Sequence, residues 1–171
     1  MLGRTVFALA PHQARFGAEA GMVHPLPDGL PPSRAVMAAN METALNVIWD
    51  AGAGPGDRIA VVGAGVVGAL VGYLAARLPG AEVELIDVNP ARAALAEALG
   101  CRFAEPEAAE GGADVVIHAS ATAAGLATAL ALAGAEAVVV EASWYGAGEV
   151  AAPLGAAFHS QRLTLRASQV G

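Results

Sequence analysis

The chain has 171 residues, of which 56% are hydrophobic and 15% are charged, and its formal net charge is −7. This length suits one α/β domain with a short additional segment, and the negative charge argues against nucleic acid as a partner. The single cysteine, Cys101, excludes an internal disulfide and a zinc site built from several cysteines. No apolar run reaches about 18 residues, and no signal-peptide pattern opens the chain. We therefore expect a soluble, cytoplasmic protein that contacts no membrane.

The N-terminal stretch, residues 1–32, is not typical of a nucleotide-binding fold. Residues 4–10 predict a strand, and the four prolines between positions 25 and 32 disfavour regular structure after it. Ser33 is placed to cap a helix that runs from Arg34 to about Ala51. We therefore divide the chain into an N-terminal segment, residues 1–32, and a main domain, residues 33–171.

A glycine-rich turn follows the next predicted strand. The apolar run from Ile59 to Val62 leads directly into the pattern G-x-G-x-x-G, which opens a helix from Val66 to about Leu78. The three glycines are Gly63, Gly65 and Gly68. A second strand from Glu82 to Ile86 then leads to Asp87, about 20 residues beyond the glycines. This succession of strand, turn, helix, strand and acid is the fingerprint of a dinucleotide-binding unit.

Each glycine has a separate physical role in such a unit. Gly63 lets the backbone turn off the strand, Gly65 lets a pyrophosphate approach the main chain, and Gly68 lets the helix pack on the sheet. The phosphates then meet the helix N-terminus, at the amides of Val66 and Val67. The alternative is a glycine-rich packing turn that binds nothing.

Asp87 is expected to accept hydrogen bonds from both hydroxyls of the adenosine ribose. A 2′-phosphate would meet the like charge of this carboxylate, so we predict NAD rather than NADP. Arg92 offers a nearby cation that would weaken this discrimination, and Val88 and Asn89 complete this group of candidate contacts. The helix before the glycines adds four polar candidates for contact with the far end of the cofactor: Asn40, Glu42, Thr43 and Asn46. For Glu42 and Asn46 the alternative is a solvated helix face.

The rest of the chain predicts alternating helices and strands, as a parallel sheet requires. An acidic loop at residues 105–112 is expected to be solvated. The expected helices run over residues 91–99, 124–132 and 154–158, and the expected strands over residues 101–104, 114–119, 137–140 and 162–166.

The end of the fourth strand is a candidate contact for the nicotinamide side of the cofactor. In open α/β sheets, ligands lie beyond the carboxyl ends of the strands, where the strand order reverses. Ala119 and Ser120 should therefore lie near the ribose next to the nicotinamide. His118, inside the strand, is interpreted as a packed core residue rather than a catalyst. Trp144 and Tyr145 follow the fifth strand, where they would either wall a cofactor pocket or cap the core.

This layout resembles the cofactor-binding half of the medium-chain dehydrogenase/reductase family, the zinc-type alcohol dehydrogenases and their relatives. The resemblance covers nearly the whole chain. It implies an α/β fold with a doubly wound parallel Rossmann sheet of six strands, in the order 3-2-1-4-5-6, that binds NAD in extended form. It also implies an oxidoreductase that moves hydride between the nicotinamide and an alcohol or aldehyde-type carbon, and a homodimer formed through strand 162–166. The segments that carry it are ANMETALNVIWDAGAGPGDRI at 39–59, GAGVVG at 63–68, IDVNPAR at 86–92, ADVVIHAS at 113–120 and LGAAFHSQRLTLRASQVG from Leu154.

The catalytic domain of that family is mostly absent from this sequence. Residues 2–30 look like its last strands, where the chain prepares to cross into the nucleotide domain. The zinc ligand that the resemblance implies in this region falls at about Ala39, which cannot bind metal, and Glu42 lies almost one helical turn away. We therefore expect no zinc and no catalytic residue in this chain, and no activity from the chain alone.

Two other functions compete with a dehydrogenase domain. A transferase that binds S-adenosylmethionine also uses a glycine turn and an acid after the second strand, although Gly68 and the segment 87–92 weigh against it. A non-catalytic nucleotide-binding or dimerisation module would use the same fold without chemistry.

Overall fold

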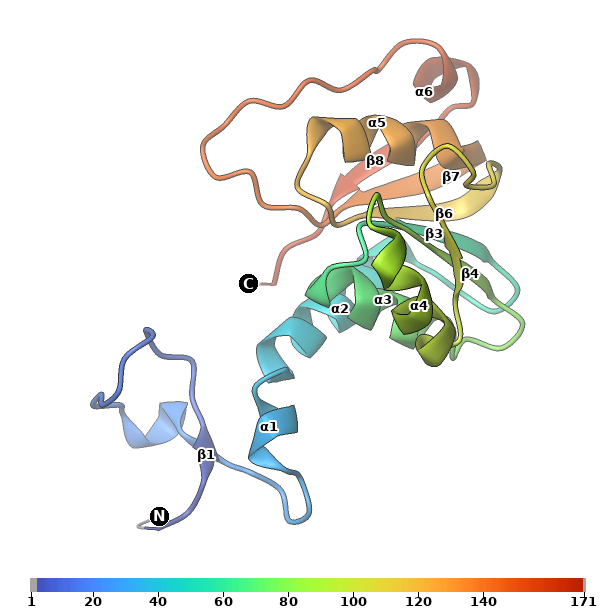
Figure 1. Ribbon diagram of the computed structural model, residues 1–171. Coiled ribbons are helices and arrows are strands. Elements are labelled where there is room, and N and C mark those ends of the chain that lie inside the picture. The colour runs from blue at the N-terminus through green and yellow to red at the C-terminus, as the bar shows by residue number, and fades with distance from the viewer. Residues whose placement is uncertain (1–2, 171) are drawn as a thin grey trace.

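The computed structural model describes residues 3–170 and shows a six-stranded parallel sheet with helices on both faces (Figure 1). The spatial order of the strands is β5-β4-β3-β6-β7-β8. When the strands of this sheet alone are numbered along the chain, the order becomes 3-2-1-4-5-6, because β1 and β2 form a separate two-stranded sheet. The strands of the large sheet are β3 (Arg58–Val62), β4 (Glu82–Ile86), β5 (Arg102–Ala104), β6 (Ala113–His118), β7 (Ala133–Glu141) and β8 (Thr164–Ala167).

The helices divide between the two faces of the sheet (Figure 1). On one face α2 (Ala38–Ala51), α3 (Val66–Ala75) and α4 (Ala93–Leu99) bury one apolar cluster against the strands. On the other face α5 (Ala123–Leu132) buries a second cluster. Since the central strands are covered on both sides, nearly every residue of β3 and β4 is buried, as their continuous apolar runs predict.

Two of the three fingerprint glycines are required by close packing within the chain. Gly63 has a φ of 105°, and a Cβ there would lie 2.8 Å from the backbone nitrogen of Ser120. A Cβ on Gly68 would lie 1.8 Å from the carbonyl oxygen of Gly63. These contacts bring α3 and the start of the β6–α5 loop close to the turn after β3.

The N-terminal segment differs from its predicted structure. The expected strand over residues 4–10 is reduced to β1 (Val6–Phe7), which pairs with β2 (His24–Pro25) in antiparallel fashion. A 3-10 turn, η1 (Ala20–Met22), lies between them. In Figure 1 this segment lies apart from the large sheet.

Ser33 is not a helix cap. Helix α1 (Pro32–Ala35) begins one residue before it, with Pro31 as the cap. The physical reason is that Pro32 fixes φ at a helical value and suits the first helical position. The single helix expected from Arg34 is also wrong, because the turn at Val36 and Met37 separates α1 from α2.

The C-terminal elements are shifted from their predicted positions. Strand β7 begins at Ala133 rather than at residue 137, and the short helix α6 (Ala157–Ser160) begins three residues later than expected. Strand β8 cannot begin at Arg162, since that residue has a φ of 58°, in the left-handed region.

Smaller differences occur at the other element ends. Helix α3 ends at Ala75 instead of residue 78, and β5 begins after Cys101, whose N–H donates to the carbonyl of Ala96 in the middle of α4. The expected helix over 91–99 is a 3-10 turn, η2 (Pro90–Arg92), followed by α4. Within residues 3–170, no helix is both long and apolar enough to cross a membrane.

Candidate functional site

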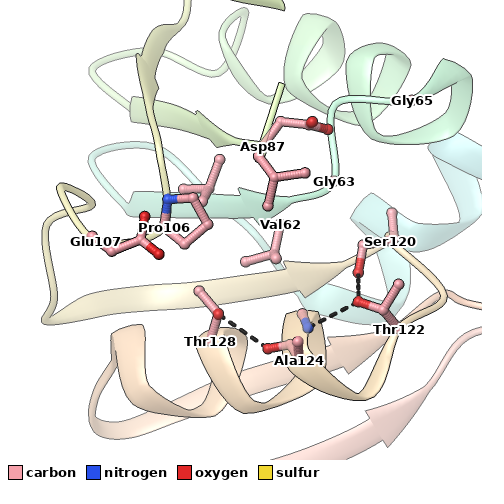
Figure 2. A pocket seen from close by; sticks show the side chains of 14 residues that line it. Val62, Gly63, Gly65, Asp87, Pro106, Glu107, Ser120, Thr122, Ala124 and Thr128 are labelled. Carbon is pink, nitrogen blue, oxygen red and sulfur yellow. Dashed lines mark hydrogen bonds between the residues drawn. The ribbon is translucent and has the colours of Figure 1, made fainter. Parts of the chain in front are cut away.

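A crevice with a volume of about 580 Å³ lies beyond the carboxyl ends of the central strands (Figure 2). It lies where β3 and β6 are neighbours. At this point the strand order reverses, because β4 and β5 are added on one side of β3, and β6, β7 and β8 are added on the other. One wall is the turn after β3, and another is the first turns of α5. The residues that line it are Val62, Gly63, Gly65, Ile86, Asp87, Val88, Pro106, Glu107, Ala119, Ser120, Thr122, Ala124, Gly125 and Thr128.

Gly65 differs from the other two glycines of the turn. It is exposed on the crevice and caps α3, and a Cβ there would meet no described residue within 4 Å. Its φ of −73° is open to any residue, so neither packing nor backbone strain explains a glycine here. Within residues 3–170, no side chain caps the N-terminus of α3. The first amides of this helix are therefore open to a partner in the crevice.

Asp87 is held in place by backbone amides at the end of β4. Its Oδ2 accepts a hydrogen bond from the Ala64 N–H at 2.7 Å, and its Oδ1 accepts one from the Asn89 N–H at 2.9 Å. These two bonds fix the carboxylate beside the glycine turn (Figure 2). Each oxygen retains a lone pair that can accept a further hydrogen bond from a ligand hydroxyl.

Six of the residues predicted to bind a cofactor line the crevice: Gly63, Gly65, Asp87, Val88, Ala119 and Ser120. Val66, Val67, Gly68, Asn89 and Arg92 do not line it, although the first two lie in the first turn of α3.

Thr43 and the other polar candidates on α2 are also outside the crevice. Thr43 Oγ1 donates to the Ala39 carbonyl of its own helix at 3.1 Å. Asn46 donates to Ser168 at 3.2 Å, so it joins α2 to the C-terminal segment.

Sequence reasoning missed eight of the lining residues. Val62 and Ile86 are the last residues of β3 and β4, and their position just before the turns could have predicted that they line the crevice. Thr122 caps α5 and accepts from the Gly125 N–H, which a pattern of cap residues would also have indicated. Pro106 and Glu107 come from the acidic loop that we expected to be merely solvated.

His118 is fully buried, as expected for a core residue, but its surroundings are polar. Its Nδ1 lies 2.8 Å from a carboxylate oxygen of Glu141 at the end of β7, and its Nε2 lies 2.7 Å from Ser120 Oγ. Tyr145 donates from its hydroxyl to the same carboxylate at 3.1 Å. Trp144 is 78% exposed, and neither aromatic residue lines the crevice.

The charges around His118 follow from these contacts. Burial by itself would raise the pKa of Glu141, but hydrogen bonds from His118 and from the Ser143 N–H outweigh it and lower that pKa below its usual range. Burial and then the Glu141 carboxylate raise the pKa of Tyr145 to about 12. At neutral pH the carboxylate is therefore ionised, and the phenol keeps its proton.

Within residues 3–170, no group of three or more histidine, cysteine, aspartate or glutamate side chains is arranged to hold a metal ion.

No protein-family model matches the chain. Among solved structures, an alcohol dehydrogenase from Thermus sp. ATN1 has a TM-score of 0.72 and is 29% identical, over 85% of this chain and 45% of its own. A thermostable alcohol dehydrogenase from Pyrobaculum aerophilum has a TM-score of 0.77 at 23% identity, over 90% of this chain and 46% of its own. A putative zinc-binding dehydrogenase from Sinorhizobium meliloti, bound to NADP, has a TM-score of 0.76 at 23% identity, over 86% of this chain and 47% of its own.

The chain spans less than half the length of each of these proteins. The likeness shows that it shares its fold with part of these dehydrogenases.

Proposed function

We propose that the chain binds NAD(H) in the crevice and is the cofactor-binding part of an oxidoreductase similar to the zinc-type alcohol dehydrogenases. The observation that carries this proposal is Gly65, a glycine for which the described chain gives no packing or backbone reason. A ligand that must approach the main chain closely supplies the missing reason.

The residues around the crevice fit the parts of a dinucleotide. The diphosphate would lie against Gly65 and the uncapped N-terminus of α3, where N–H groups and the helix dipole favour negative charge. Asp87 would accept from the hydroxyls of the adenosine ribose. Ala119 and Ser120 would lie beside the second ribose. The bound nicotinamide supplies hydride transfer, and we assign to this chain no residue that catalyses that step.

Two features support an oxidoreductase over the alternatives. The solved structures with this fold include alcohol dehydrogenases and a zinc-binding dehydrogenase bound to NADP. The third fingerprint glycine, Gly68, is needed where α3 packs on the turn, as in dinucleotide-binding units. A transferase that binds S-adenosylmethionine and a non-catalytic module are the competing functions.

A homodimer is part of the same proposal. Strand β8 is the last strand of the sheet, and all four of its residues are exposed. An exposed edge strand offers unpaired backbone groups to a second copy of the chain.

Titration with NADH and with S-adenosylmethionine separates the competing functions. We expect the fluorescence of NADH to increase on binding, because the dinucleotide moves from water into the crevice, and we expect no heat of binding with S-adenosylmethionine. Binding of S-adenosylmethionine alone would favour the transferase. If neither ligand binds a folded sample, the non-catalytic module is the better description.

Replacing Asp87 by serine should reduce the preference for NAD over NADP. The substitution removes the charge that would repel a 2′-phosphate, and we expect the ratio of the two affinities to change by about tenfold or more. The measurement is a pair of titrations with NADH and NADPH, and Asp28→Ser, an exposed aspartate in the N-terminal segment, is the matched control. An unchanged ratio would mean that Asp87 does not contact the ribose.

A further inference from the structure

A continuous line of hydrogen bonds connects the N-terminus of α5 with the end of β7. The Gly125 N–H donates to Thr122 Oγ1 at 3.0 Å, and Thr122 Oγ1 lies 3.0 Å from Ser120 Oγ. Ser120 Oγ lies 2.7 Å from His118 Nε2. The Nδ1 of the same ring lies 2.8 and 2.9 Å from the two oxygens of Glu141.

The ionised Glu141 fixes the position of the hydrogens along this line. A carboxylate can only accept, so His118 carries its proton on Nδ1 and its Nε2 is an acceptor. The Ser120 hydroxyl therefore donates to Nε2, and its oxygen accepts from Thr122. Glu141 keeps this role because it also accepts from the Ser143 N–H at 2.8 Å and from the Tyr145 hydroxyl.

We propose that Ser120, His118 and Glu141 form a nucleophile, base and carboxylate triad, and that Ser120 reacts with carboxylic esters that carry a good leaving group. The hydroxyl and its base are within hydrogen-bonding reach, and the carboxylate orients the base, which is the arrangement that activates a serine. Such triads are recognised by geometry and occur on unrelated folds.

The crevice gives the hydroxyl both access and a source of positive potential. Ser120 and Ala124 line the same crevice, so a carbonyl group beside Ser120 also meets the start of α5. Ala123 and Ala124 are in the first turn of this ten-residue helix, where N–H groups have no partner within the helix. These amides are suited to stabilise the oxyanion that forms on attack.

Gly125 supports the same assignment. A Cβ at this position would lie 2.0 Å from Ser120 Oγ and 2.8 Å from His118 Nε2. Only glycine therefore lets α5 approach the serine and its base so closely. The glycine is thus explained by the side chains of the triad.

The reaction consumes one ester and one water. Ser120 Oγ forms a bond to the acyl carbon as its proton moves to His118 Nε2, and the bond from carbon to the leaving oxygen breaks. The leaving oxygen departs as an anion. Water then attacks the acyl carbon and gives up one proton to the solvent, the bond from carbon to Ser120 Oγ breaks, and the proton held on His118 Nε2 returns to Ser120 Oγ as the acid is released. Since His118 is fully buried, Ser120 stands between its Nε2 and the crevice. A leaving group that needs a proton, such as an amine, is therefore disfavoured.

The test is covalent labelling of the full chain with a fluorophosphonate, followed by mass spectrometry. Ser120 Oγ should bond to phosphorus as fluoride leaves and the proton passes to His118. We expect one addition per chain, mapped to Ser120, and a stoichiometric burst of p-nitrophenolate from p-nitrophenyl acetate followed by slow turnover. Ser120→Ala should lose both signals, and Ser160→Ala, an exposed serine outside the crevice, should keep them.

Glu141 is tested as a positioning residue. Glu141→Gln should slow the labelling by about tenfold or more, because the histidine tautomer is no longer fixed, and Glu141→Asp should restore part of the rate. Circular dichroism verifies that each variant is folded. The proposal is overturned if folded protein is not labelled at Ser120, or if Glu141→Gln reacts as fast as the original.

The labelling needs no dinucleotide, so its outcome is independent of the NAD(H) proposal. If both hold, NADH should protect Ser120, since the two ligands share the crevice. NADH binding without labelling would overturn the triad alone.

Discussion

Replacing Gly65 by valine should severely weaken NADH binding and leave the free energy of unfolding close to that of the original protein. The valine side chain would occupy the place of the diphosphate at the N-terminus of α3, which separates the phosphates from the helix amides. Loss of two hydrogen bonds to a charged group, at about 1.5 kcal/mol each, weakens affinity by about 100-fold. Stability is retained because no described residue lies within 4 Å of the new Cβ. The measurements are NADH titration and urea unfolding.

Gly155→Val is the matched control for this substitution. Gly155 is also exposed, and its Cβ would also meet no described residue within 4 Å, but it lies outside the crevice. This variant should bind NADH as the original does. If Gly65→Val retained its affinity, the diphosphate would have to lie elsewhere, and the central observation behind the NAD(H) proposal would fail.

Replacing Gly68 by alanine should have the opposite pattern, with a large loss of stability. The new Cβ would lie 1.8 Å from the carbonyl oxygen of Gly63, which is backbone and cannot rotate away. Helix α3 would have to move off the turn, and we expect the free energy of unfolding to fall by about 3 kcal/mol. The measurement is the midpoint and slope of urea unfolding.

Gly72→Ala is the comparison for Gly68→Ala, since both glycines are buried on the same helix. At Gly72 the new Cβ would meet a side-chain atom of Leu85 at 2.8 Å, which can shift to another rotamer. The gain in helix propensity is the same at both positions and cancels in the comparison. Gly72→Ala should therefore be the less damaging change. Equal losses at both positions would contradict the close packing of α3 on the turn.

The sheet could be predicted because its central strands carry continuous apolar runs between glycine turns. Strand β4 was predicted with its observed bounds, and the end of α4 was marked by Gly100, which has a φ of 85°. The C-terminal elements could not be placed as well. Glu136 and Arg162 have φ values of 60° and 58°, which L-residues rarely adopt, and the contact that joins their segments runs from the Glu136 N–H to the Gln161 carbonyl. Such tertiary contacts leave no local sequence signal.

The two halves of the site, the glycine turn with Asp87 and the polar line through His118, also differ in how well the sequence predicts them. The positions of Gly65 and Asp87 are encoded by spacing along one strand, turn, helix and strand unit, so the sequence predicted their place beside the crevice. The polar line through His118 depends on the pairing of β6 with β7, which sets His118 opposite Glu141. That register is a property of the folded sheet. Ser120 was therefore predicted as a cofactor contact, and its link to the histidine was missed.

Glu141 sits at one end of the hydrogen-bonded line, yet its single negative charge decides which way every proton along it points. An amide in its place could face either way, and the imidazole and both hydroxyls would then rotate among several arrangements of nearly equal energy. One carboxylate at the end of β7 therefore selects a single arrangement of the hydrogens as far as the start of α5. The side chains in this wall of the crevice are thus ordered by a residue of β7, two strands away from the strand that leads into the glycine turn.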